Sequence, residues 1–134
     1  MKALFFVLSF FIIALLINGC SNQTESAETS KYDDITSEQL KAMIENEGEK
    51  VYVADVHIPE QEHIKGTDAF IPYNEIGKNL DKLPSDKNAA IALYCRSGSM
   101  SREAAETLAS LGYTNVYNQL GGANDWREKG FEFQ

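Results

Sequence analysis

Short, nearly continuous apolar runs recur along the chain after its first thirty residues. Residues 51–56 (VYVADV) are largely apolar and residues 89–94 (AAIALY) are apolar at successive positions, a pattern typical of strands that are buried on both faces. Residues 115–117 predict a further strand, and residues 70–72 a short extended segment. Because helices cover both faces of parallel sheets, these runs predict a sheet that is enclosed on both sides.

Segments with apolar residues three and four positions apart lie between these runs. Thr36 and Gln39 form the pattern of a capping box, and an apolar stripe begins at Leu40. We therefore expect a helix that starts after Thr36 and stops near Gly48. Strands that alternate with helices predict an α/β domain with a mainly parallel sheet. Further helices are predicted over three segments, namely residues 74–80, residues 101–111, and the stretch that Gly121-Gly122 opens and that carries Trp126.

The first apolar run, residues 3–17, is too short for a membrane-spanning helix. Its fifteen residues would rise only about 22 Å, against a hydrocarbon core of about 30 Å. With Lys2 before it, the run has the pattern of a secretory signal peptide. The segment Ile17-Asn18-Gly19-Cys20 resembles the lipobox of bacterial lipoproteins. This resemblance implies that residues 1–19 are removed and that Cys20 carries a lipid.

The sequence therefore divides into a signal peptide (residues 1–19), a lipidated and polar tether (residues 20–31) and one folded domain (residues 32–134). The expected location is the bacterial cell envelope, with the domain attached to the membrane through its lipid alone and facing the extracytoplasmic side. A plain signal peptide that is cut elsewhere, or an uncleaved anchor, is the alternative.

Charge and cysteine content narrow the possible partners. The formal net charge is −8, and loss of residues 1–19 with Lys2 would make it −9. Such acidity disfavours binding to nucleic acid and electrostatic attachment to a membrane surface. Beside the lipid-bearing cysteine only Cys95 remains, so an exported domain would have one reactive thiol and no disulfide framework. The two histidines lie far from any cysteine pair, and neither a metal site nor a cofactor is indicated.

The loop Tyr94-Cys95-Arg96-Ser97-Gly98-Ser99-Met100-Ser101 carries the strongest indication of chemistry. It joins a predicted strand to a predicted helix, and such a turn aims successive backbone N–H groups and the positive helix end at one point. A cysteine there is expected to be a nucleophilic thiolate near neutral pH. A buried structural cysteine is the alternative, since unpaired cysteines are commonly buried.

The order and spacing of motifs over about a hundred residues resemble the single-domain rhodanese family of sulfurtransferases. The resemblance implies a three-layer α/β/α sandwich with a central, mainly parallel sheet. It also implies that Cys95 carries sulfane sulfur as a persulfide, taken from thiosulfate or a similar small sulfur-containing anion and passed to cyanide or a thiol. The matching motifs are Val53-Ala54-Asp55-Val56, His63-Ile64 with Gly66, Ile71-Pro72, Leu83-Pro84, Tyr94-Cys95-Arg96-Ser97-Gly98, Gly112-Tyr113, Asn115-Val116-Tyr117, and Gly121-Gly122 with Trp126.

The chemistry of sulfur transfer assigns roles to the loop residues. Cys95 is the expected nucleophile. Arg96 is expected to attract a dianionic donor through fork-like hydrogen bonds, and Asp55 and Arg102 are expected to support the site. The expected cradle for the anionic sulfur consists of the helix end and the backbone amides of Ser97, Gly98, Ser99, Met100 and Ser101.

Two positions depart from the family pattern. Members often have an arginine two residues after the loop glycine, where this chain has Met100, and this weakens the expectation of a salt bridge inside the loop. Members also often read Asp-x-Arg where this chain has Asp55-Val56-His57. His57 could titrate near neutral pH, but a surface role is the simpler expectation. His63 is expected to form structural hydrogen bonds.

Two other functions stay open. A phosphatase or arsenate reductase of related fold needs a cysteine, five further residues and then an arginine, and in this chain Ser101 occupies that last position. The domain could instead be a non-enzymatic module, or a relay that passes a persulfide or redox equivalents to the thiol of an exported protein.

Overall fold

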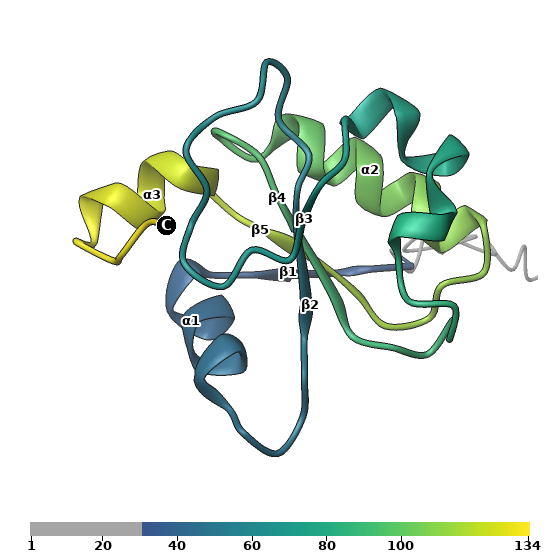
Figure 1. Cartoon of the computed structure of the whole chain (residues 1–134), viewed down its shortest axis with the longest axis horizontal. Coiled ribbons are helices and arrows are strands. Elements are labelled where there is room, and N and C mark those ends of the chain that lie inside the picture. Colours follow the sequence, from purple (N-terminus) through teal and green to yellow (C-terminus); the bar gives the residue numbers. More distant parts are fainter. Residues whose placement is uncertain (1–30) are drawn as a thin grey trace, which may run out of the picture.

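The computed structural model describes residues 31–134 and has a parallel sheet between two layers of helices (Figure 1). Helices α1 (Ser37–Glu45) and α3 (Gly122–Glu128) cover one face. Helix α2 (Ser99–Ser110) and the 3-10 helices η1 (Tyr73–Lys78) and η2 (Leu80–Lys82) cover the other. The predicted three-layer α/β/α sandwich is thus confirmed. The strand order is β1-β5-β4-β2-β3, with β1 Asp33–Ile35, β5 Val116–Gln119, β4 Ile91–Tyr94, β2 Tyr52–Asp55 and β3 Ala69–Phe70.

The side chains of the central strands alternate between two cores, because successive residues of a strand point to opposite faces. In β4, Ile91 and Leu93 pack beneath α2, whereas Ala92 and Tyr94 pack beneath α1 and α3. Cys95 follows β4 directly and belongs to the core beneath α2. The alternation therefore assigns the cysteine to the α2 side of the sheet.

The beginning of α1 agrees with the sequence, and its end does not. Thr36 caps the helix, and Thr36 and Gln39 form the predicted capping box. The helix ends at Glu45 and does not continue to Gly48. Asn46 adopts an extended backbone and its Oδ1 accepts a hydrogen bond from the Gly48 N–H at 2.9 Å. This side-chain turn replaces the last predicted turn of the helix.

Three other elements differ from their predicted form. The helix expected over residues 74–80 is the pair of 3-10 helices η1 and η2. Helix α2 starts at Ser99, two residues before its predicted start. Strand β1 was not predicted, because two of its three residues are exposed and give no apolar pattern.

The predicted signal peptide (residues 1–19) and the predicted lipid site at Cys20 lie outside the described residues. Within residues 31–134, no helix combines the length and the apolar composition that crossing a membrane requires.

Candidate active site

Cys95 lies at the carboxyl end of β4, and its side chain is almost completely buried. The backbone of Gly98 has a φ of 111°, and its N–H donates to Cys95 Sγ at an N to S distance of 3.0 Å. Residues that carry a Cβ rarely adopt this φ, so glycine at this position allows the loop to turn back toward the sulfur. Helix α2 begins at Ser99, and the first N–H groups of a helix have no partner within it. Such amides suit an anionic sulfur.

The hydroxyl of Ser101, in the first turn of α2, points into the same space. Its Oγ lies 3.5 Å from Cys95 Sγ and 2.7 Å from Asn118 Oδ1. Asn118 Nδ2 in turn donates to Asp34 Oδ1 at 2.8 Å. Ser101 and Asn118 are buried, whereas Asp34 is exposed. Polar side chains thus connect the surface carboxylate to the buried sulfur.

Asn118 and Asp34 were not among the predicted site residues. One signal was available for Asn118, because it continues the predicted strand 115–117 and a polar residue in a buried strand needs a partner. Asp34 gave no such signal, since it follows a polar segment and is itself exposed. Only the pairing of β1 with β5, which sets Asp34 opposite Asn118, brings the two together.

Helix α3 holds the backbone of the loop from the other side. The Ala123 N–H donates to the carbonyl oxygen of Cys95 at 2.8 Å, and the Asn124 N–H donates to that of Arg96 at 3.1 Å. Because N–H and C=O point in opposite directions across a trans peptide, the amides that follow these carbonyls are directed away from α3. A Cβ on Gly122 would overlap the carbonyl oxygen of Cys95, so the approach of α3 depends on glycine.

The predicted loop residues divide into exposed and packed groups. Arg96, Ser97 and Ser99 are exposed. No group within residues 31–134 forms a hydrogen bond or ion pair with the Arg96 guanidinium, so it can bind an incoming anion without breaking an existing contact. Met100 packs against the core beneath α2. Arg102 is exposed on α2 and lines a hollow of about 470 Å³ whose other lining residues are Tyr73, Ser99, Met100, Glu103 and Glu106.

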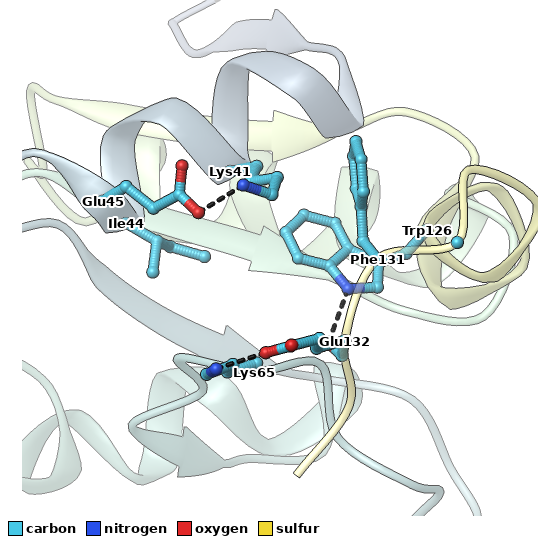
Figure 2. A pocket seen from close by; sticks show the side chains of 8 residues that line it. Lys41, Ile44, Glu45, Lys65, Trp126, Phe131 and Glu132 are labelled. Carbon is cyan, nitrogen blue, oxygen red and sulfur yellow. Dashed lines mark hydrogen bonds and ion pairs between the residues drawn. The ribbon is translucent and has the colours of Figure 1, made fainter.

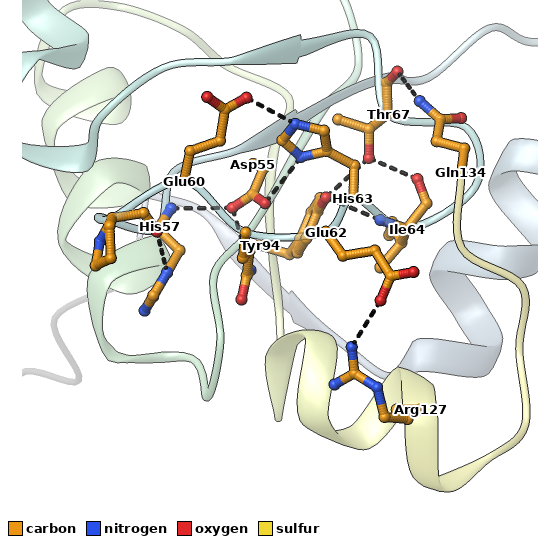
Figure 3. A network of polar contacts seen from close by, with 12 residues as sticks. Asp55, His57, Glu60, Glu62, His63, Ile64, Thr67, Tyr94, Arg127 and Gln134 are labelled. Carbon is orange, nitrogen blue, oxygen red and sulfur yellow. Dashed lines mark hydrogen bonds and ion pairs between the residues drawn. The ribbon is translucent and has the colours of Figure 1, made fainter.

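Asp55 lies at the end of β2, in register with Tyr94, and its fully buried carboxylate binds the segment that follows this strand (Figure 3). It accepts the His57 N–H at 3.0 Å and lies 3.1 Å from His63 Nδ1. The other ring nitrogen of His63, Nε2, lies 3.0 Å from Glu60 Oε1. These contacts do not include Cys95. Asp55 is bonded to the rim segment, residues 57–63, and His63 forms the hydrogen bonds expected of it.

Tyr94 extends this network on the α1 and α3 side of the sheet. Burial, followed by the Asp55 carboxylate, raises the pKa of Tyr94, so its phenol stays protonated. Its hydroxyl accepts the Ile64 N–H at 3.1 Å and lies 2.8 Å from Thr67 Oγ1. The ring of His57 is engaged locally, with Nδ1 2.7 Å from the carbonyl oxygen of Pro59.

A second hollow, of about 480 Å³, lies on the opposite face from Cys95, between α1, α3 and the C-terminal segment (Figure 2). Its lysines are already paired, Lys41 with Glu45 and Lys65 with Glu132. Its described lining contains no cysteine, serine or threonine. Among residues 31–134, no group of three or more His, Cys, Asp or Glu side chains is arranged to hold a metal ion.

Known proteins share both the sequence and the fold of this domain. The model of the Rhodanese-like domain family matches residues 33–129. The thiosulfate sulfurtransferase PspE of Escherichia coli K12 is 39% identical over 74 residues, which cover 53% of this chain and 69% of that protein. The thiosulfate sulfurtransferase GlpE of Actinobacillus pleuropneumoniae serotype 7 is 30% identical over 105 residues, covering 77% and 94% of the two chains. The crystal structure of a rhodanese-like domain protein from Staphylococcus aureus superposes with a TM-score of 0.62 at 28% identity, over 76% of this chain and 98% of that one.

Proposed function

Since this chain belongs to the rhodanese-like domain family, we propose that it is a sulfurtransferase that carries sulfane sulfur on Cys95 as a persulfide. One observation supports this most directly. The unpaired Cys95 lies at the end of a central strand, where its sulfur accepts the N–H of Gly98 and lies beside the first turn of α2. Donors around a sulfur favour its anionic form, which sulfur transfer needs both before and after the reaction.

The proposed reaction has two nucleophilic displacements on sulfur. First, the Cys95 thiolate attacks the outer sulfur of thiosulfate; a bond forms between Sγ and that sulfur, the S–S bond of thiosulfate breaks, and sulfite leaves with the electron pair. Second, cyanide or a thiolate attacks the outer sulfur of the persulfide, and the Cys95 thiolate leaves with the electron pair. No proton moves in either step when cyanide or a thiolate is the acceptor. Hydrogen-bond donors can therefore serve in place of a general base.

Mass spectrometry after incubation with thiosulfate tests this proposal. The purified chain should gain one sulfur atom on Cys95, and cyanide should remove it as thiocyanate. A chain that gains no sulfur from thiosulfate would contradict the proposed donor and leave the non-enzymatic module as the better account of the domain.

Arg96→Ala is expected to raise the KM for thiosulfate more than it lowers kcat. The exposed guanidinium would bind the dianionic donor before reaction as well as in the transition state, and such uniform binding appears mainly in KM. A charge-assisted contact of about 1.5–3 kcal/mol predicts a roughly ten- to hundredfold loss in kcat/KM. Steady-state kinetics at low salt measure this. Arg127→Ala is the matched control, because it removes the same charge from an arginine that is paired with Glu62. Equal kinetics in the two variants would show that Arg96 does not contact the donor.

We propose further that the protein is a lipid-anchored protein of the bacterial cell envelope, with its acceptor outside the cytoplasm. Cyanide or the thiol of an exported protein is the acceptor class that fits this location, because no cytosolic thiol pool operates there. The support for this proposal is the Ile17-Asn18-Gly19-Cys20 motif after an apolar run of signal-peptide length.

Cys20→Ala is therefore expected to release the chain from the membrane fraction. Stable anchoring needs more than one acyl chain, and the lipoprotein resemblance supplies several at one cysteine. Metabolic labelling with a fatty-acid analogue should mark the natural chain and Cys95→Ala equally and leave Cys20→Ala unmarked. Equal labelling of Cys20→Ala would place the lipid elsewhere.

A further inference from the structure

The hydroxyl of Ser101 has one proton and three acceptors within reach. Asn118 Oδ1 lies 2.7 Å from Ser101 Oγ, the carbonyl oxygen of Gly98 lies 3.2 Å away, and Cys95 Sγ lies 3.5 Å away. The carbonyl of Gly98 already accepts the N–H of Arg102. Since Ser101 and Asn118 are buried, water does not compensate an acceptor that loses the hydroxyl proton. The sulfur and the Asn118 amide therefore compete for it.

Asp34 decides this competition by fixing the orientation of the Asn118 amide. An ionised carboxylate only accepts hydrogen bonds, so the amide turns its Nδ2 toward Asp34 Oδ1, at 2.8 Å. The amide oxygen then faces Ser101, and because this oxygen also only accepts, the hydroxyl must donate to it. In this arrangement Ser101 has no proton left for the sulfur.

We propose that Asp34 is a positioning residue that, through Asn118, keeps the Ser101 proton away from the anionic sulfur. Without the carboxylate, the amide can turn over so that its Nδ2 donates to Ser101 Oγ, and the hydroxyl can then donate to Cys95 Sγ. The thiolate would thereby have two donors, Ser101 and the Gly98 N–H, in place of one. This inference rests on the proposed role of Cys95 as the nucleophile.

Asp34 lies at the surface, although the Ser101 hydroxyl that it influences is buried. Asp34 is exposed on β1, an edge strand that pairs only with β5, and it lies in register with Asn118. Charged groups of α2 lie near Tyr32, two residues before Asp34. Burial, followed by the carboxylates of Glu106 and Asp34, raises the pKa of Tyr32, and Arg102 acts in the opposite direction. Tests of Asp34 must therefore separate loss of its hydrogen bond from loss of its charge.

The test measures the rate at which iodoacetamide alkylates Cys95 across a range of pH. It uses the full chain with Cys20→Ala, so that Cys95 is the only thiol. In Asp34→Ala the pH of half-maximal rate is expected to fall by about one unit, the effect of one added donor to an anion. Asp33→Ala is the matched control, because it removes the same charge from the adjacent exposed position of β1. Among the described residues, Asp33 forms no hydrogen bond or ion pair with Asn118. Asp34→Asn keeps an oxygen that can still accept from Asn118 Nδ2, so its shift should be smaller than that of Asp34→Ala.

A Ser101→Ala background separates the proposed path from a direct charge effect. If Asp34 acts through the Ser101 hydroxyl, then in this background Asp34→Ala should shift the pH of half-maximal rate no more than Asp33→Ala does. Two results would overturn the proposal. One is an equal shift of the pH of half-maximal rate in Asp34→Ala and Asp33→Ala when Ser101 is present. The other is an Asp34→Ala shift that persists in full in the Ser101→Ala background. Alkylation needs no sulfur donor. The alkylation rates would therefore still test the role of Asp34 if the chain failed to take sulfur from thiosulfate.

Discussion

Replacement of Cys95 by serine or alanine is expected to abolish sulfur transfer and to leave the fold intact. The sulfur atom is the group that would form and break the bond to the transferred sulfur, and a serine oxygen at the same place cannot form a persulfide. Serine keeps nearly the size of cysteine and can still accept the Gly98 N–H, so we expect the melting temperature to change by no more than a few degrees. Thiocyanate formation from thiosulfate and cyanide measures turnover, and thermal unfolding measures the fold.

The control for this prediction is Cys20→Ala, which removes the other cysteine of the sequence and should keep full turnover in detergent solution. Turnover above the uncatalysed rate in Cys95→Ala or Cys95→Ser would refute the assignment of the nucleophile. A variant that loses its cooperative unfolding would instead show that the buried sulfur is needed for packing.

Gly122→Ala should impair the site almost as severely, although Gly122 carries no reactive group. Its Cβ would overlap the backbone of Cys95 and Arg96, and backbone atoms of a short loop cannot move aside as the end of a flexible side chain can. We expect α3 to move away, the hydrogen bonds from its amides to the loop carbonyls to be lost, and kcat/KM to fall by about a hundredfold or more, as a displacement of about 1 Å can cause.

Gly112→Ala provides the matched comparison. Gly112 also has a positive φ, of 91°, but, apart from its chain neighbours, no atom of residues 31–134 lies within 4 Å of the position that its Cβ would take. The left-handed backbone should cost both variants about 1–2 kcal/mol of stability. Gly122→Ala should lose more stability because of the overlap, and only Gly122→Ala should lose activity. Kinetics for Gly122→Ala that match those for Gly112→Ala would mean that α3 does not shape the loop.

The parts of the fold that the sequence predicted correctly are those that local patterns determine. The strand within residues 51–56 is apolar except for Asp55, and the strand that ends before Cys95 is apolar throughout, because both faces of these strands are covered. The start of α1 could be predicted because Thr36 and Gln39 bond each other within one turn. The Cys95 loop could be predicted for the same reason, since its cysteine, its glycine and its helix start all lie within residues 95–99.

What could not be predicted depends on contacts between distant segments. Strand β1 is short and mostly exposed, so only its pairing with β5 makes it a strand. The contact of Asp34 with Asn118 follows from that pairing, and so do the surroundings of Ser101. The placement of Asp55 in a network with His63 depends on the path of the rim segment, which periodicity does not encode. The site thus combines a local loop with positioning groups from both ends of the domain.

The strand order also determines when, during synthesis, the cysteine acquires its surroundings. Strand β5 is made late but lies between β1 and β4, so β1 has no neighbour in the sheet until β5 exists. The amides that hold the loop carbonyls belong to α3, which is made later still. A chain that is still emerging, or one that is threaded through a membrane unfolded, therefore carries Cys95 as an ordinary thiol. The reactivity that we propose for Cys95 would arise only when the last quarter of the chain has folded onto the rest.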